Sequence, residues 1–142
     1  KSRNPEVKKN SASEIATYYA TVLENSESAR IWWGKVDQGG ASPEEIAAVY
    51  ELAKMDGAVG KTDSAIQRLE SLVARPVPKN TQWFVLVHYQ LAALHHTLEQ
   101  FPEALQHYQE VAEHPEVKGL EQYRDLSNKT ALQIEAYLAQ LH

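Results

Sequence analysis

Apolar residues recur every three or four positions along most of this chain, and this spacing predicts a series of amphipathic helices. The first apolar stripe covers residues 15–23, and the capping-box spacing of Ser11 and Glu14 places the start of a helix near Ser13. A second stripe, 29–36, is either a second helix or a continuation of the first. No long stretch alternates with a period of two, so the pattern predicts an all-α fold.

The clearest helix start lies at Ser42, which is expected to cap a helix with Pro43 in its first turn and Glu45 as the capping-box partner. A glycine-bracketed turn and a second apolar stripe follow, so residues 43–76 are predicted to form a helical hairpin. Residues 81–115 repeat this organisation and predict a second hairpin.

The two ends of the chain differ in pattern. Residues 1–12 are polar and charged, and they are expected to be a flexible lead-in. Residues 118–142 carry apolar residues at helical spacing and predict a single closing helix. Residues 13–142 are therefore expected to form one helical domain. The residues expected to face the second hairpin from this closing helix are Tyr123, Leu126, Ile134, Tyr137, Leu138 and Leu141.

The two predicted hairpins repeat each other at an interval of 39 residues. Such a period is typical of stacked helical repeats, because one hairpin cannot cover its own apolar face. In the first hairpin the repeated positions are Val49, Leu52, Ala53, Asp56, Ala65, Leu69, Leu72 and Pro76. They recur as His88, Leu91, Ala92, His95, Ala104, Tyr108, Val111 and Pro115.

This set resembles the tetratricopeptide repeat, whose pattern is W-x2-L-G-x2-Y, then A-x3-F, then P. The Trp and the Tyr of the first helix are replaced in both copies, Ala stands for Gly, and the interval is about five residues longer than the family's 34. The resemblance covers about residues 43–116. It implies an α-solenoid of stacked antiparallel hairpins with a C-terminal capping helix; an unrelated helical bundle is the alternative. The small residues expected at close helix crossings are Ala53, Ala65, Ala92 and Ala104.

The composition of the chain argues against some partners and cellular locations. Asp and Glu outnumber Lys and Arg by 19 to 14, which argues against nucleic-acid binding. The chain has no cysteine, which excludes disulfides and fits either the cytoplasm or the bacterial periplasm. No apolar run approaches the roughly 20 residues of a membrane helix. Because the first residue is Lys1 rather than Met, an upstream signal peptide, anchor or further domain is expected.

The sequence favours a non-enzyme without a cofactor. It has no glycine-rich phosphate loop, no supported Ser/His/Asp arrangement and no cysteine nucleophile. Two histidine pairs, His88 with His95 and His107 with His114, are each seven residues apart on a helix. Their spacing of roughly 10 Å is too long for one zinc ion without a third element, so packing or surface roles are favoured over a metal site.

Tetratricopeptide proteins bind other proteins through the first helix of each hairpin, so the resemblance implies a scaffold or adaptor that binds a protein or peptide. Only Lys54 matches the Lys/Asn/Arg set with which some members hold a peptide carboxylate, so an internal segment or a folded partner is favoured. Packing between hairpins is the alternative role for the two tyrosines of this groove. The groove is expected to carry Ala47, Tyr50, Glu51, Lys54, Leu86, Tyr89, Gln90, Ala93 and His96.

A second hypothesis is a structural spacer that self-associates as a homo-oligomer within a larger assembly, membrane-anchored or secreted. Trp32 and Trp33 are candidates for an N-terminal interface, because exposed aromatic side chains contribute strongly to binding. Packing in the core is the alternative for these two residues. The dependence of molecular mass on concentration distinguishes the two hypotheses.

Overall fold

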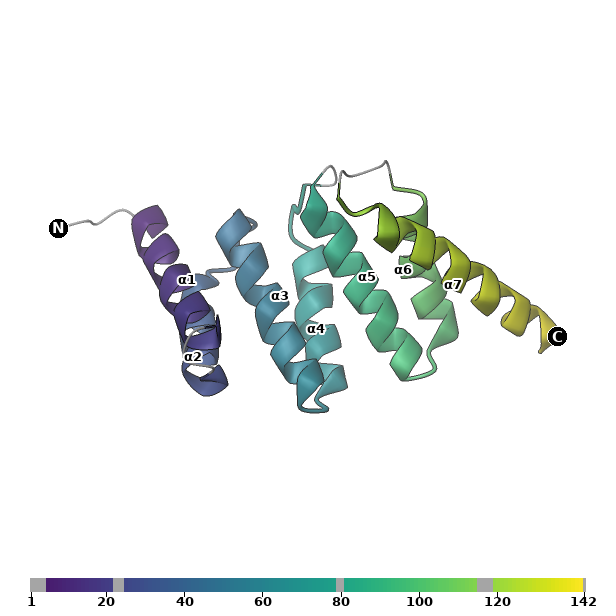
Figure 1. Cartoon of the computed structure of the whole chain (residues 1–142), viewed down its shortest axis with the longest axis horizontal. Coiled ribbons are helices and arrows are strands. Elements are labelled where there is room, and N and C mark those ends of the chain that lie inside the picture. Colours follow the sequence, from purple (N-terminus) through teal and green to yellow (C-terminus); the bar gives the residue numbers. More distant parts are fainter. Residues whose placement is uncertain (1–4, 22–24, 79–80, 115–118, 142) are drawn as a thin grey trace. The chain divides into compact units, whose positions relative to one another are not determined.

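A computed structural model describes the chain over residues 5–21, 25–78, 81–114 and 119–141 (Figure 1). Side chains are described from Ala12 onward. Within these ranges the regular structure consists of seven helices and no strand, which confirms the predicted all-α class. The helices group into two compact units, residues 1–77 and 78–142. The expectation of one continuous domain stays a prediction.

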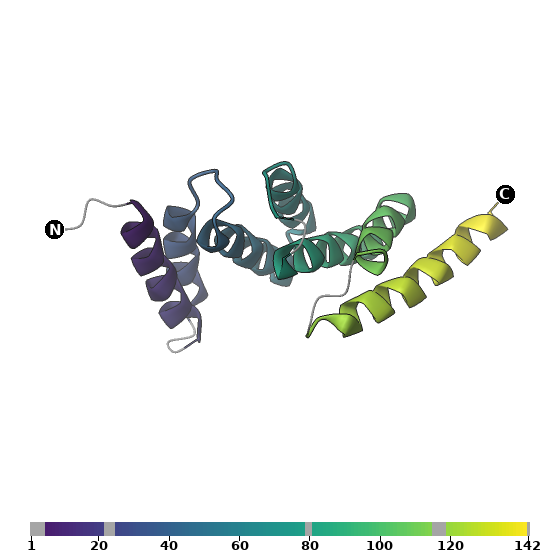
Figure 2. The same ribbon diagram turned by 90° about the horizontal axis from the view of Figure 1, so that it is seen from above.

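The first unit contains two pairs of antiparallel helices. Helix α1 packs on α2, α3 packs on α4, and both α1 and α2 contact α3 (Figures 1 and 2). Gly60, at φ +84°, makes the left-handed turn between α3 and α4, a conformation that favours glycine. The bounds are α1 (Pro5–Thr21), α2 (Ser26–Val36), α3 (Pro43–Ala58) and α4 (Thr62–Val73).

Helix α1 begins earlier than the sequence pattern indicates. Its first residue is Pro5, whereas the capping-box spacing predicts a start near Ser13, so most of the expected lead-in is helical. Proline is well tolerated in the first turn of a helix, because its missing N–H would have no partner there. Apolar spacing predicts only the part of a helix that packs against other residues. The polar first turns of α1 have no apolar spacing, so the sequence pattern did not predict them.

The core of the first unit has a large share of alanine. Ala12 and Ala16 of α1 pack with Ala29 and Trp33 of α2 in one buried cluster. Such small side chains let helices approach closely, so α1 and α2 pair along their length. Other members of this cluster are Val36, Ala48 and Leu52, and the α3–α4 contact buries Ala53, Ala65, Leu69 and Leu72.

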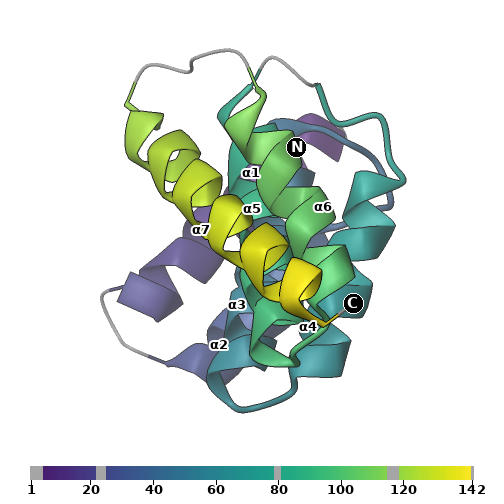
Figure 3. The ribbon, with the colours of Figure 1, turned by 90° about the vertical axis from the view of Figure 1, so that its right-hand side faces the viewer.

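The second unit is a hairpin with a third helix packed on it. Helix α7 packs mainly on α6 and also touches α5 (Figure 3). Glu99 adopts φ +57° in the turn between α5 and α6, where Gln100 donates its backbone N–H to the carbonyl of His95 at 2.9 Å. The bounds are α5 (Gln82–Thr97), α6 (Phe101–Ala112) and α7 (Glu121–Gln140). The buried cluster contains Ala92, Ala104, Tyr108, Ala131 and Ile134.

The buried side of α7 differs from the one expected. Leu126 and Leu141 are 48% and 60% exposed, so the prediction that they lie against the second hairpin is wrong. Tyr137 is 46% exposed, but its ring meets Phe101 of α6 edge-on at 5.1 Å, as predicted. Ser127 and Ala131 are buried in their place. Small side chains at these positions let α7 lie close to α6, which a leucine would prevent. The expected contacts of Ile134 are confirmed, and Tyr123 and Leu138 are half-buried.

Candidate functional site

The α3 half of the predicted groove is a partly exposed stripe of mixed chemistry. Tyr50 and Glu51 are half-buried, as is Ala47, and Lys54 is exposed. The Lys54 ammonium lies 3.4 Å from a Glu51 carboxylate oxygen and 5.5 Å from the centre of the Tyr50 ring. Lys54 thus lies close to both an acidic and an aromatic side chain at the surface of α3.

The α5 half of the predicted groove is more involved in packing. The Tyr89 ring meets Tyr108 of α6 edge-on at 6.0 Å and Tyr123 of α7 at 5.0 Å. His96 lies 3.2 Å from the Tyr108 hydroxyl through its Nδ1, and its ring contacts Phe101. Burial, and next the proximity of Tyr123, raises the pKa of Tyr89 above its usual value. The other three predicted groove residues, Leu86, Gln90 and Ala93, are half-buried.

Tyr50 and Tyr89 are 39 residues apart and equivalent in the repeat, and the Tyr89 ring is contacted by a third helix of its own unit, α7. The α3 half of the predicted groove belongs to the first unit and the α5 half to the second. The role of all these residues in binding stays a prediction.

The tryptophans of α2 have different environments. Trp33 is 5% exposed and belongs to the core of the first unit, as its packing alternative predicts. Trp32 is half-buried, with the Lys35 ammonium 4.2 Å from its ring centre. Two large apolar side chains near them, Tyr18 of α1 and Ile31 of α2, are 51% and 57% exposed.

A buried aspartate joins three helices of the first unit. Asp56 of α3 is 2% exposed and contacts Arg30 of α2 at 2.8 Å and Arg68 of α4 at 2.7 Å. The Ser64 hydroxyl donates to the same carboxylate at 2.9 Å. Burial acts to raise the pKa of Asp56, but hydrogen bonds from Arg68, Ser64 and Arg30 outweigh it and hold the pKa below its usual value. Most of the repeated positions in the first hairpin are apolar, and Asp56 is one of these positions. This placement was the sequence feature that could have predicted its burial.

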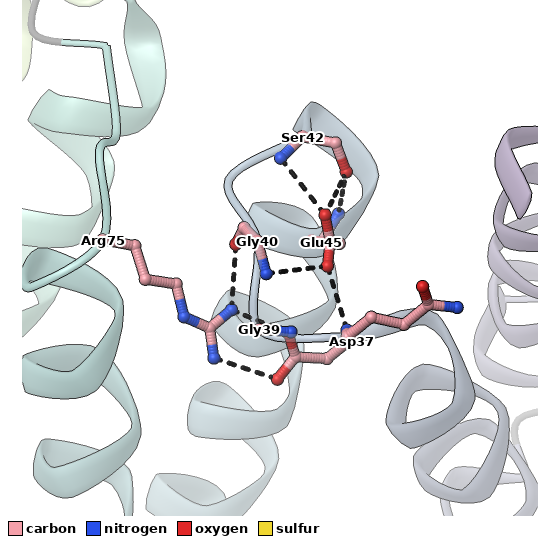
Figure 4. A network of polar contacts seen from close by, with 7 residues as sticks. Asp37, Gly39, Gly40, Ser42, Glu45 and Arg75 are labelled. Atoms are coloured by element: carbon pink, nitrogen blue, oxygen red, sulfur yellow. Dashed lines mark hydrogen bonds and ion pairs between the residues drawn. The ribbon is translucent and has the colours of Figure 1, made fainter.

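The start of α3 organises the preceding loop around one carboxylate, that of Glu45 (Figure 4). This carboxylate accepts backbone N–H bonds from Gln38 and Gly40, both at 2.9 Å, and the Ser42 hydroxyl bond, also at 2.9 Å. Ser42 in turn accepts the backbone N–H of Glu45, so the predicted capping box is confirmed. A Cβ at Gly40 would lie 2.5 Å from a Glu45 oxygen, so a larger residue there would displace the Glu45 carboxylate from this position.

The same loop is tied to the chain beyond the end of α4 by Arg75. Its guanidinium contacts both Asp37 carboxylate oxygens, at 2.7 and 3.1 Å, and donates to the Gly40 carbonyl at 3.1 Å (Figure 4). The hydrogen bond to Asp37 raises the pKa of Arg75, against the opposing effect of burial. This two-pronged contact fixes the loop that leads into α3.

A shallow pocket of about 370 Å³ lies beside this ion pair in the first unit. Two arginines line it, but Arg75 is paired with Asp37 and Arg68 with Asp56. The charges are thus compensated within the chain, which makes the pocket a polar surface feature rather than a strong anion site. The lining residues are Asp37, Val49, Ser64, Gln67, Arg68, Ser71 and Arg75.

In the second unit the fold brings together histidines that are distant in sequence. His88 of α5 and His107 of α6 face each other with their Nδ1 atoms 2.9 Å apart. The described residues contain no group of three or more His, Cys, Asp or Glu placed to hold a metal ion. The sequence analysis compared histidines on the same helix, such as His88 with His95. It therefore did not predict the contact between His88 and His107 on two different helices.

Among the described helices, none combines the length and the apolar character of a membrane span, in line with the expectation of no membrane insertion. Comparisons of the chain with models of protein families, with curated proteins and with solved structures found no match.

Proposed function

We propose that this chain is a non-catalytic scaffold module that binds a protein or peptide, and that its helical hairpins are of the tetratricopeptide type. The stripe of Tyr50, Glu51 and Lys54 on α3 is the observation that carries the proposal. The remainder of α3 is occupied: its apolar side faces α2 and α4, and Asp56 holds both of them. The stripe is partly exposed, with Lys54 at the surface and Tyr50 and Glu51 half-buried, so a partner can reach it.

The small residues of the repeat support the tetratricopeptide type of hairpin. Ala53 and Ala65 in the first hairpin, and Ala92 and Ala104 in the second, are all fully buried. Alanine at these points allows close helix crossing in both hairpins, as the repeat pattern requires. The stripe on α3 presents both charges and a ring, so its proposed ligand is an internal segment or a folded surface with polar and apolar groups.

The test replaces Tyr50 by Ala and Lys54 by Glu in the full chain, because Lys54 is exposed and Tyr50 is partly exposed. Immobilised wild type and variant are incubated with the same cell extract, and captured proteins are quantified by mass spectrometry. Aromatic hot spots contribute about 2 kcal/mol or more, so we expect at least about a tenfold loss of the captured partner. Tyr89→Ala is less suitable, since Tyr89 packs on α6 and α7.

Lys61→Glu is the matched control, because it reverses an exposed charge in the turn between α3 and α4. It should capture as much partner as the wild type. Equal capture by the double variant, with unchanged circular dichroism, would contradict the proposed surface.

A self-associating spacer is the second proposal, and the exposure of Tyr18 and Ile31 favours it. Light scattering over a concentration series measures the mass directly. If this face associates, Ile31→Ser with Trp32→Ser should lower the mass at high concentration while the helix content is kept. Trp33 is left unchanged, because its burial would confuse lost association with lost folding. A monomeric wild type at every concentration would exclude this second proposal.

A further inference from the structure

All six histidines of the chain lie in the second unit, and a group of them meets between α5 and α6. His88 is 8% exposed and His95 is 6% exposed. The ring of His107 faces both: its Nδ1 is 2.9 Å from that of His88, and its plane lies within 6° of that of His95 at 5.7 Å. His95 also contacts the Gln100 side chain at 2.7 Å.

The contact between His88 and His107 depends on the number of protons it holds. With one proton between the two Nδ1 atoms, one ring donates and the other accepts a hydrogen bond. When both rings are protonated, two N–H groups point at each other and the rings carry like charges. The hydrogen bond is then lost and replaced by repulsion, in a place where burial strengthens both effects.

The described contacts of His88 are with aromatic rings. The Phe84 ring lies 4.3 Å from it, and His114 stacks on the other end of this aromatic group at 4.8 Å from Phe84. Helix α7, which also packs on α5, contributes the Tyr123 ring against Tyr89. Among the described residues no carboxylate contacts His88. Burial first, then His107 and His114, lower the pKa of His88 from 6.5 to about 4.

We propose that the His88–His107 contact is a pH-sensitive switch, which keeps the α5–α6 hairpin closed at neutral pH and opens it when both imidazoles are protonated. The unfolded chain takes up the proton on this histidine more readily than the folded chain does. The stabilisation is therefore complete above pH 6.5 and is lost as the pH falls toward 4.

The switch does not depend on the proposed function, but opening of the α5–α6 hairpin would affect a partner bound to α5. Helix α5 carries Leu86 and Gln90, which the sequence predicts to line a protein-binding groove. Opening of the hairpin would therefore release a partner bound there. The first unit contains no histidine and should keep its structure over the same pH range.

The test is amide hydrogen exchange of the full chain at pH 7.5 and pH 5, corrected for the intrinsic exchange rate. With pKa values of 6.5 unfolded and about 4 folded, the equilibrium constant for opening of α5 and α6 should rise about 30-fold at pH 5. Helices α3 and α4 serve as the internal control and should change much less. An equal loss of protection in both units would overturn the proposal.

Two variants assign the effect to the pair. His88→Phe removes the buried titrating group and should abolish most of the 30-fold response, whereas His96→Gln, on the same helix but bonded to Tyr108, should retain it. If His88→Phe is unfolded at pH 7.5, His107→Gln is used, because it leaves one imidazole and should reduce the response. An NMR titration that places the pKa of His88 in the wild type near 6.5 would overturn the switch whichever variants fold.

Discussion

Asp56 shows how a single charged side chain is kept inside the first unit. Its carboxylate is 2% exposed, but Arg30, Arg68 and Ser64 surround it with donors. Each arginine is more than one-third exposed, so its own charge is still partly hydrated. The group therefore joins α2, α3 and α4 without leaving an unpaired buried charge.

We expect Asp56→Asn to lower the free energy of unfolding by about 1–2 kcal/mol, because two charge-assisted hydrogen bonds are weakened. The partial exposure of both arginines keeps the loss below that of a fully buried pair. Urea denaturation of the full chain measures it. Asp125→Asn is the control: its ion pair with Arg124 spans 3.8 Å at the surface, so less than about 0.5 kcal/mol is expected. Equal effects of the two variants would show that Asp56 is not a structural centre.

The pH dependence of the same variant follows from the sign of the pKa shift. The pKa of Asp56 is lower in the folded chain than the usual 3.8, so its stabilisation is present above pH 3.8 and lost as the pH falls further. The difference in stability between wild type and Asp56→Asn should therefore be constant from pH 7 to 5 and shrink below 3.8. Urea titrations across this range measure the difference. A constant difference down to pH 2 would contradict the lowered pKa.

A third residue-scale prediction concerns Ser127 of α7. Its hydroxyl is fully buried and has no hydrogen-bond partner in the described part of the chain. Removing an unsatisfied buried polar group is favourable, so Ser127→Ala should raise the free energy of unfolding by about 1 kcal/mol. Thermal melting compares it with Asn128→Ala, an exposed change on the same helix with little expected effect. A lower melting temperature for Ser127→Ala would indicate that the hydroxyl is bonded.

At the scale of elements, the contact between helices is set by how close their backbones can come. Ala104 of α6 is fully buried in a cluster with Ala92, Tyr108 and Ala131, whereas Gln106 two positions later is exposed. Ala104→Leu should therefore overpack the cluster and cost about 1–3 kcal/mol, while Gln106→Leu should cost little. Chemical denaturation of both variants tests the register of the hairpin. Similar stabilities would mean that α6 does not present Ala104 to its neighbours.

At the scale of the whole molecule, each unit has its own buried cluster. The cluster that contains Trp33 draws only on residues 12–52, and the cluster that contains Tyr108 draws only on the second unit. Helix α7 supplies two members of the latter, Ala131 and Ile134. Its removal should therefore affect the second unit far more than the first.

Deleting residues 118–142 should expose the α6 surface and abolish much of the amide protection in α5 and α6, with aggregation at high concentration. Protection in α3 and α4 should persist, since these helices pack on each other and α3 packs also on α1 and α2, all within the first unit. Hydrogen exchange read helix by helix measures both. Leu132→Ser, at a position 59% exposed on α7, is the control and should leave both units protected. Full protection of α5 and α6 without α7 would contradict its packing role.

Some features of this protein were predictable because they depend on residues within a few turns of one another. The helical stripes predicted the helices, and Ser42, Pro43 and Glu45 predicted the start of α3, because a capping box is closed within one turn. Buried alanines at Ala53 and Ala104 were likewise predictable from the spacing of the repeat. The polar stretch before Ser13 was the exception, because a helix that extends beyond its packed part has no apolar pattern to reveal it.

Sequence alone determined most helical segments, the hairpins α3–α4 and α5–α6 and the alanines buried in them, since periodicity, caps and short turns are local. The tertiary structure decided the rest: the face of α7 that is buried, the arginines that meet Asp56 and the approach of His88 to His107. These depend on the shape of a neighbouring surface and on residues far apart in the sequence, such as Arg30 and Asp56, which are 26 positions apart. The apolar spacing of an amphipathic helix is compatible with more than one buried face. The shape of the surface on the partner helix decides which of its leucines are buried.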